Sequence, residues 1–472
     1  MTCTKLLRLP IPVALILVLV AWGYSRAANR ISPVPEQEAL EIGVEAYIYG
    51  YPLVTMEMTR RTMSNVPAPL AMKAPMGQFA NAREYPNAAF KDVTAPNADT
   101  LYSAAWLDLS KQAYILHVPN EDGRYYLMPM LDGWTNVFAS PGKRTTGTKA
   151  GDYLISGPHW KGAVPRRVAH YKSPTDMVWI IGRTYSTGTP EDFNEVHAIQ
   201  DRYLLKPLSA YGKPYSPPKG RVDPNIDMKT PPRDQVNRMP AAAYFKLLAA
   251  LINRNPPSAA DSPIIGKMAK VGIVPGRDFD IGKLESAVAK ALEQATTTGL
   301  EQIQEEATRV GKRVNGWQMT LTGKYGTDYL FRAATTLVGL GANLPEDAIY
   351  PMTTTDGSGQ RLNGANKYIL HFEKGKLPPV NGFWSLTMYN AQYFFVENPL
   401  NRYTLSQRSK FNLNPDGSVD LYLQHEPPLG NPQANWLPAP ESNFNLILRM
   451  YWPKEAVLDG SWKPPAVLPA NR

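Results

Sequence analysis

Two stretches of alternating apolar and polar residues, separated by a stretch with helical spacing, constrain the fold of this chain more than any other feature. From about Phe90 to Tyr185 the alternation runs between turn signals, as in YILHVPNEDGRYYLMPMLDGWTNVF. It returns from about Ala348 to the last strand-like run, NFNLILRMYWP. Between the two, apolar residues recur at helical spacing. The pattern predicts an α+β protein with two β-sandwich-like modules separated by a helical region.

The length of 472 residues favours two or three domains over one core. After residues 1–27, a helical segment is expected over 35–65 and a β-rich module over 70–188. A helical region with a proline-rich excursion is expected over 189–344, and a second β-sandwich module over 345–465.

Local signals add detail to these expectations. Pro52 is expected to kink or divide the first helix, and Thr189 followed by Pro190 begins another helix. Residues Phe411 and Leu413, followed by a Pro-Asp-Gly-Ser turn, predict a hairpin. Further helices are expected over Ala241–Ile252, Leu284–Ala295, Leu300–Val310 and Tyr329–Leu340.

The first residues have the layout of a secretory signal peptide. Lys5 and Arg8 precede an apolar run from Ile11 to Trp22, and small residues around Ala27 follow. The run is about 12 residues, short for a membrane span of about 20. We expect cleavage after Ala27 or Ala28 and a periplasmic protein with no stable membrane span; an uncleaved membrane anchor is the alternative.

Removal of this leader changes the chemistry of the chain. The single cysteine, Cys3, lies within it, so the mature chain would have no disulfide and no thiolate metal site. The net charge falls from +9 to +6 as Lys5, Arg8 and Arg26 leave. The remaining basic residues form no stripe with interleaved aromatics, so no nucleic-acid partner is expected.

Signatures of metal, nucleotide and dinucleotide sites are missing from the sequence, so no metal and no cofactor is expected. His197 and Asp201 are four residues apart on a predicted helix, but a metal site needs further ligands. The expected partner is a small-molecule or carbohydrate-like ligand. A homo-oligomer is also expected, since β-rich modules and proline-rich arms often associate.

Several motifs together resemble two known families. NADTLYSAAWLDL, RYYLMPMLDGWTNVF and YLISGP resemble the N-terminal family domain of unknown function 1254. GFWSLTMYN, NPLNRYTL, NPDGSVDLYLQ and NWLPAPESNFNLILRMYWP resemble its companion, domain of unknown function 1214. The resemblance implies a bacterial, often exported protein with β-rich modules at both ends and helices between them. It implies no activity.

The polar residues of NADT are the first candidates for a site. Asp99 is a candidate acid or base, and Asn97 a candidate orienting residue. The alternative is an Asx turn in which both side chains satisfy local backbone groups.

Three arginines near strand ends, Arg124, Arg144 and Arg183, are candidates to bind a carboxylate, sulfate or phosphate. The alternative is a set of separate ion pairs. Among the aromatics, Tyr126 and Trp134 are candidate substrate-binding residues, and Trp134 is expected to be partly exposed; for most aromatics, core packing is the alternative.

In the C-terminal part, Arg402, Arg449 and Trp436 are expected to stabilise the fold rather than bind a ligand. Arg402 and Arg449 are expected to donate to backbone carbonyls, and Trp436 to fill the core.

Two hypotheses of function follow. One is a hydrolase or lyase that acts on a small organic or carbohydrate-like anion. The other is a non-catalytic ligand-binding or cell-envelope protein. An enzyme should gather Asn97, Asp99, Arg124 and Arg144 around one pocket, whereas a binding module should leave them apart.

Overall fold

The computed structural model describes residues 34–90, 95–430 and 433–470. Within them it contains eight α-helices and 21 strands in four sheets, which confirms the α+β class and the helical middle region. The predicted signal peptide lies outside the described residues. None of the helices in the described part of the chain has the length and hydropathy needed to cross a membrane.

The N-terminal module is a pair of sheets with a shared core. Its six-stranded sheet has the order β1-β2-β9-β5-β6, and β4 also pairs with β9. Its four-stranded sheet has the order β10-β3-β7-β8. Apolar side chains such as Leu107, Leu116 and Ile180 fill the space between them. The strands are β1 (Ala80–Asn81), β2 (Thr100–Asp108), β3 (Tyr114–Val118), β4 (Tyr126–Leu127), β5 (Met130–Asp132), β6 (Val137–Ala139), β7 (Gly151–Ser156), β8 (Ala169–Lys172), β9 (Met177–Tyr185) and β10 (Leu204–Pro207).

The C-terminal module repeats this arrangement. A seven-stranded sheet of order β11-β12-β14-β20-β16-β17, with β13 on β20, faces a sheet of order β19-β18-β15-β21. Leu370, Leu386 and Leu448 lie in the core between them. The strands are β11 (Lys312–Val314), β12 (Trp317–Met319), β13 (Ala348–Ile349), β14 (Met352–Thr353), β15 (Tyr368–Phe372), β16 (Val380–Asn390), β17 (Thr404–Ser406), β18 (Val419–Gln424), β19 (Trp436–Pro438), β20 (Phe444–Pro453) and β21 (Val467–Pro469).

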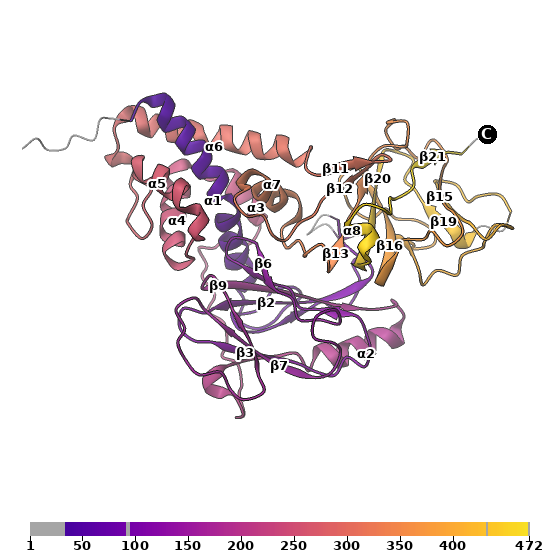
Figure 1. Cartoon of the computed structure of the whole chain (residues 1–472), viewed down its shortest axis with the longest axis horizontal. Helices are drawn as coiled ribbons and strands as arrows, with labels where there is room; N and C mark the ends of the chain where they lie inside the picture. The colour runs from indigo at the N-terminus through magenta and orange to yellow at the C-terminus, as the bar shows by residue number, and fades with distance from the viewer. Residues whose placement is uncertain (1–33, 91–94, 431–432, 471–472) are drawn as a thin grey trace, which may run out of the picture.

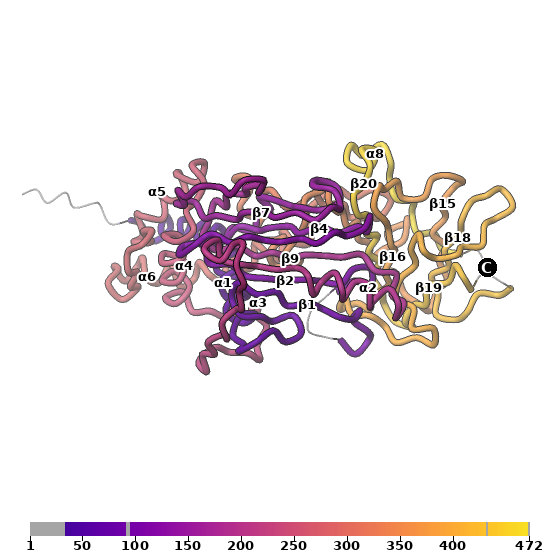
Figure 2. The backbone as a smooth tube through the Cα atoms, turned by 90° about the horizontal axis from the view of Figure 1, so that it is seen from below, coloured from indigo at the N-terminus to yellow at the C-terminus, as the bar shows by residue number. Residues whose placement is uncertain are grey.

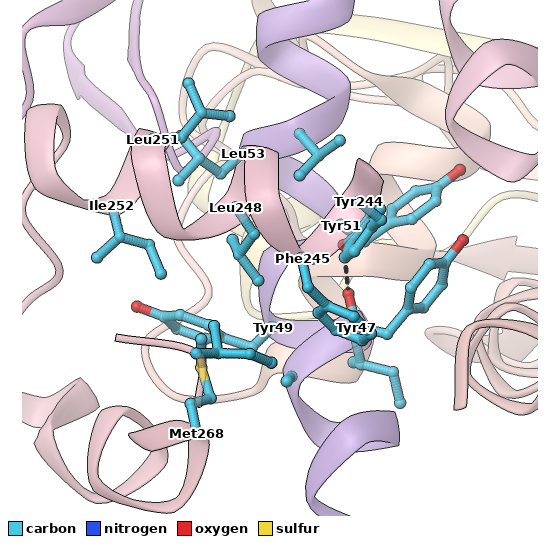
Figure 3. Close-up of a cluster of buried hydrophobic side chains, with 14 of the residues drawn as sticks. Tyr47, Tyr49, Tyr51, Leu53, Tyr244, Phe245, Leu248, Leu251, Ile252 and Met268 are labelled. Carbon is cyan, nitrogen blue, oxygen red and sulfur yellow. Dashed lines mark hydrogen bonds between the residues drawn. The ribbon is translucent and has the colours of Figure 1, made fainter. Parts of the chain in front are cut away.

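Six helices, α1 and α3 to α7, form a layer on the outer face of the six-stranded sheet (Figure 1). Helix α2 packs on the core between the two N-terminal sheets, and α8 packs on the C-terminal module. Helix α1 packs against five other helices. From Ala46 to Glu57 it is buried on all sides, whereas Glu38, Glu41 and Glu45 lie on an exposed side of its first turns. Figure 3 shows Tyr47 and Tyr49 of α1 among side chains of α4. The helices are α1 (Glu36–Ser64), α2 (Pro190–Gln200), α3 (Pro232–Asn237), α4 (Ala241–Arg254), α5 (Ser262–Lys270), α6 (Ser286–Ala307), α7 (Tyr329–Gly339) and α8 (Glu455–Leu458).

Strands β2 and β9 position the two halves of the molecule. They pair over nine residues without a register shift, from Thr100 opposite Tyr185 to Asp108 opposite Met177. Trp106 and Trp179 stack at the helical end of this face, with ring centroids 4.7 Å apart. Figure 2 shows both strands running from the helices toward β16 of the C-terminal module.

Some local expectations were wrong. Helix α1 continues through Pro52, and the helices expected over 284–295 and 300–310 are one helix, α6. Residues 312–319, between two of the predicted helices, form β11 and β12 of the C-terminal sheet.

The predicted hairpin at 411–424 has its turn and its second strand, β18, but no first strand. The Asn435 side chain bonds both the backbone N–H and the carbonyl of Asn412, so these groups are used outside a strand ladder. The proline-rich excursion, residues 213–231, contains no helix or strand and folds back on the end of α1, where Gly220 N–H donates to Pro67 O over 2.9 Å.

Close approach of α1 and α6 requires glycine at position 43. A Cβ atom there would lie 2.7 Å from the Cβ of Ala295, which has no flexible end that can move away. We expect Gly43→Ala to lower the free energy of unfolding by about 1–3 kcal/mol through overpacking. Gly266→Ala on the exposed face of α5, where a Cβ meets nothing within 4 Å, should raise it by about 0.5–1 kcal/mol through helix propensity. Denaturant unfolding measures the change in the free energy of unfolding for each variant. Equal changes in the two variants would contradict the packing of α1 on α6.

Candidate functional site

The end of β2 and β9 away from the helices meets β16 and β20 of the C-terminal module. On this face Tyr102 lies opposite Arg183 in the β2–β9 register. In β20 the alternation of the strand places Leu448 and Met450 in the module's own core and leaves Arg449 and Tyr451 on the other face. We name the set Tyr102, Arg183, Tyr350, Arg449 and Tyr451 the arginine–tyrosine cluster.

Arg183 is 6% exposed, yet its guanidinium bonds only neutral groups. Nη1 donates to Ile181 O over 3.0 Å and to Asn343 Oδ1 over 2.9 Å, and Nη2 donates to Gly341 O over 3.1 Å. The Cζ atom lies 5.1 Å from the centre of the Tyr102 ring, a cation–π contact. The buried Nε has no hydrogen-bond partner.

Arg449 is 4% exposed and is also held by neutral acceptors. Nη1 donates to Thr387 Oγ1 over 2.8 Å, and Nη2 donates to Tyr389 OH over 2.6 Å and Ala95 O over 2.9 Å. The expectation that this side chain bonds backbone carbonyls is therefore confirmed.

The tyrosines supply hydroxyl groups but no negative charge. Tyr102 OH accepts from Asn97 Nδ2 over 2.9 Å, and Tyr350 OH accepts from Asn343 Nδ2 over 2.5 Å. The rings of Tyr350 and Tyr451 meet edge to face, with centroids 6.0 Å apart. Burial raises the pKa of Tyr350 and of Tyr451 above the ordinary value, so both remain neutral phenols near neutral pH.

The cluster thus holds more positive charge than its surroundings balance. Among the described residues, neither Arg183 nor Arg449 has a carboxylate oxygen within 4.0 Å. A guanidinium stays charged in proteins, and a buried charge without an opposite charge is costly. The cluster therefore combines buried positive charge with hydrogen-bond donors, which are Arg183 Nε and the phenol hydroxyls.

Asp99 lies beside the cluster but is committed to other partners. It is fully buried, its Oδ2 accepts from Ser385 Oγ over 2.6 Å, and its Oδ1 lies 3.2 Å from Arg408 Nη2. Ser385 and Arg408 belong to the C-terminal module, so this carboxylate joins the two modules.

The sequence left two roles open for Asn97, an Asx turn and the orientation of a site residue, and the structure shows both arrangements. Its Oδ1 accepts from the backbone N–H of Asp99 and of Thr100, each over 3.0 Å, which is an Asx turn. Its Nδ2 orients the Tyr102 hydroxyl of the cluster.

The structure places the other candidates elsewhere. Arg124 pairs with Asp192 and Glu195 on a separate cleft, and Arg144 pairs with Asp347 over 2.7 Å. Tyr126 is in the core of the N-terminal module. Of the predicted site residues, only Arg183 belongs to the cluster, with Asn97 and Asp99 next to it.

The expected exposure of Trp134 was wrong. Its side chain is 3% exposed, and Nε1 donates to Asn255 O over 3.2 Å. The Asp-Gly turn that precedes it lies under the helices, so the indole is covered by Tyr49 of α1.

No metal site emerges from the described ranges, where no three His, Cys, Asp or Glu side chains gather. His197 Nε2 lies 2.6 Å from Arg83 O, and Asp201 pairs with Arg83. The two side chains thus have other partners than a shared ion.

Tyr102, Tyr350 and Tyr451 were not predicted as site residues, and Arg449 was assigned to the fold alone. One signal was available for two of them. In NFNLILRMYWP the apolar residues Leu446, Leu448 and Met450 define one face, so Arg449 and Tyr451 had to lie on the other. The sequence of this strand does not predict that a second module covers the face with Arg449 and Tyr451.

Two family models match the chain, and both are described as proteins of unknown function. DUF1254 matches residues 76–207 and DUF1214 matches residues 347–455. The resemblance seen in the sequence motifs is confirmed. The DUF1254 domain contributes Tyr102 and Arg183 to the cluster, and the DUF1214 domain contributes Tyr350, Arg449 and Tyr451.

One solved structure supports the fold of the chain. The crystal structure of the VPA0106 protein from Vibrio parahaemolyticus is similar, with a TM-score of 0.70 and 24% identity over 92% of this chain and 100% of that one. An uncharacterised protein from Burkholderia cenocepacia matches with a TM-score of 0.42 and 12% identity, over 92% of this chain and 94% of that one. No curated protein matches the sequence.

The Asp99 ion pair at the domain junction can be tested by stability. Asp99→Asn leaves the Arg408 guanidinium without its opposite charge, so we expect a loss of about 2–4 kcal/mol in the free energy of unfolding. Ser385→Ala removes one hydrogen bond to the same carboxylate and should cost about 1 kcal/mol. Denaturant unfolding measures both, and an Asp99→Asn variant as stable as the wild type would contradict a structural role for this pair.

Proposed function

We propose that this protein binds a small organic anion in the arginine–tyrosine cluster between its DUF1254 and DUF1214 domains. One observation carries the proposal: two buried guanidiniums, Arg183 and Arg449, have no ion pair among the described residues. An anion at this place would balance charge that the fold has already buried.

The surrounding groups favour an organic anion. Guanidinium groups recognise carboxylate, phosphate and sulfate through directed hydrogen bonds. The rings of Tyr102, Tyr350 and Tyr451 offer apolar surface, and their hydroxyls, two of which are oriented by Asn97 and Asn343, suit the hydroxyl or carbonyl groups of a ligand.

Binding without turnover is better supported than hydrolysis or elimination. The acid expected from the sequence, Asp99, is fully buried and its oxygens face Ser385 and Arg408. The phenols with raised pKa are poor bases near neutral pH. Asn97, Asp99, Arg124 and Arg144 also do not line a common pocket, which is the arrangement expected of a binding module.

The ligand proposal is tested by binding measurements on hydroxyl deletions. Thermal shifts of the purified protein with acetate, succinate, benzoate, galacturonate, sulfate and phosphate identify the anion class, and calorimetry then gives Kd. We expect Tyr102→Phe and Tyr350→Phe to weaken binding by about tenfold or more, since each removes a donor to a charged ligand.

The matched control is Tyr422→Phe, on β18 of the four-stranded sheet away from the junction. It should leave Kd unchanged. The proposal would be refuted if Tyr102→Phe and Tyr350→Phe bound the anion as tightly as the wild type. It would also be refuted if no anion of the panel stabilised the protein. Release of product from the panel compounds during calorimetry would instead support an enzyme.

We further propose that the chain is exported to the periplasm by its N-terminal leader. The supporting pattern is Lys5 and Arg8 before the apolar run from Ile11 to Trp22. Expression in a Gram-negative host should yield a mature protein that begins at Ala28 or Asn29 and is released by osmotic shock. Edman sequencing checks this, and a chain that keeps Met1 in the membrane fraction would favour the uncleaved anchor.

Self-association of the mature chain is also proposed. The exposed proline-rich excursion and the β-rich modules are the features that support it. Static light scattering on the mature protein should give a mass of at least two chains.

A further inference from the structure

A second, open cleft lies on the outer side of the domain junction. It has a volume of about 690 Å³ and is bounded by the turn before β4, by α2 and the residues after it, and by β16. Three aromatic rings line it: Phe383 lies 4.5 Å from Tyr185 and 5.4 Å from Tyr125, measured between ring centroids. Phe383 and Tyr125 are 2% and 6% exposed, whereas Tyr185 is partly exposed, so the apolar surface that the cleft offers is the ring of Tyr185.

Three cationic side chains line the same cleft, and two of them have no acidic partner among the described residues. Arg124 is paired with Asp192 and Glu195. By contrast, Lys143 Nζ donates to Gly123 O over 2.8 Å, and Arg202 Nε donates to Ala198 O over 3.0 Å. Lys143 and Arg202 are thus free to bind an anion.

Glu121 lies at this cleft with a buried carboxyl group. The residue is 1% exposed, its Oε1 accepts from Tyr203 OH over 2.6 Å, and its Oε2 has no hydrogen-bond partner. Burial raises the pKa of Glu121 to about 7, although the Tyr203 hydrogen bond and the charges of Arg124 and Arg202 act in the opposite direction. Tyr126 of β4 also interacts with this carboxyl group, and Asp122 and Glu195 line the same cleft.

We infer that this cleft is a second ligand site, which takes a cyclic or aromatic carboxylate and takes up a proton on Glu121 as the ligand binds. The ring would lie on Tyr185, with the carboxylate against Lys143 and Arg202. A second negative charge near these cations disfavours the ionised form of Glu121, so a proton from solvent moves to its carboxyl group. The inference does not depend on the arginine–tyrosine cluster.

Calorimetric titration of the full mature protein with benzoate tests the site. Benzoate is an anion at both about pH 5.5 and about pH 8, so any change in affinity comes from the protein. For the wild type we expect an affinity about tenfold higher at the lower pH. Glu121→Gln keeps an oxygen for Tyr203 and removes the charge, so its affinity should be the same at both pH values.

Two further variants separate this site from the cluster. The double variant Lys143→Gln/Arg202→Gln should lose about tenfold in benzoate affinity at the lower pH. Tyr350→Phe, in the cluster, should leave the pH dependence intact. Absence of benzoate binding, full affinity in the double variant, or an unchanged pH dependence in Glu121→Gln would each overturn the inference.

Discussion

The uninterrupted pairing of β2 with β9 is the constraint on which the rest of the structure depends. Nine residue pairs in one register present a continuous face, and that face supports two different partners. At one end Trp106 and Trp179 pack under the helices. At the other end Tyr102 and Arg183 meet the C-terminal module. Because side chains alternate strictly along a strand, a shift of one residue would exchange this whole face for the sandwich core of the N-terminal module.

The two ends of this face differ in chemistry. Under the helices it is apolar, and its contribution to stability is ordinary burial of large rings. At the domain junction it carries buried charge. Carbonyl, amide and hydroxyl groups satisfy Arg183 and Arg449, whereas Arg408 and Arg144 pair with the carboxylates of Asp99 and Asp347. Neutral acceptors reduce the cost of a buried guanidinium but do not cancel it. A site that binds an anion would keep such charge unbalanced until the ligand arrives.

Much of the fold was readable from periodicity, because the signals are local. The predicted helix over 35–65 corresponds to α1, Glu36–Ser64. The predicted helices and strands were wrong where tertiary contacts outweighed the local conformational preference of the sequence. Pro52 is tolerated because α1 is enclosed by other helices, and the strand expected at 411–413 is absent because Asn435 takes the backbone bonds of Asn412.

For the site, the sequence by itself determined which residue types are available and which face of each strand they occupy. It gave an Asx turn as one of two alternatives for Asn97 and placed Arg183 near a strand end. The alternation in NFNLILRMYWP further implies that Arg449 lies opposite the apolar face of its strand. Only the tertiary structure decided that Arg183 and Arg449 share one buried space while Arg124 and Arg144 are neutralised by Asp192 and Asp347. The reason is physical: these partners are up to several hundred residues apart, and no local pattern records which charges meet when two modules pack.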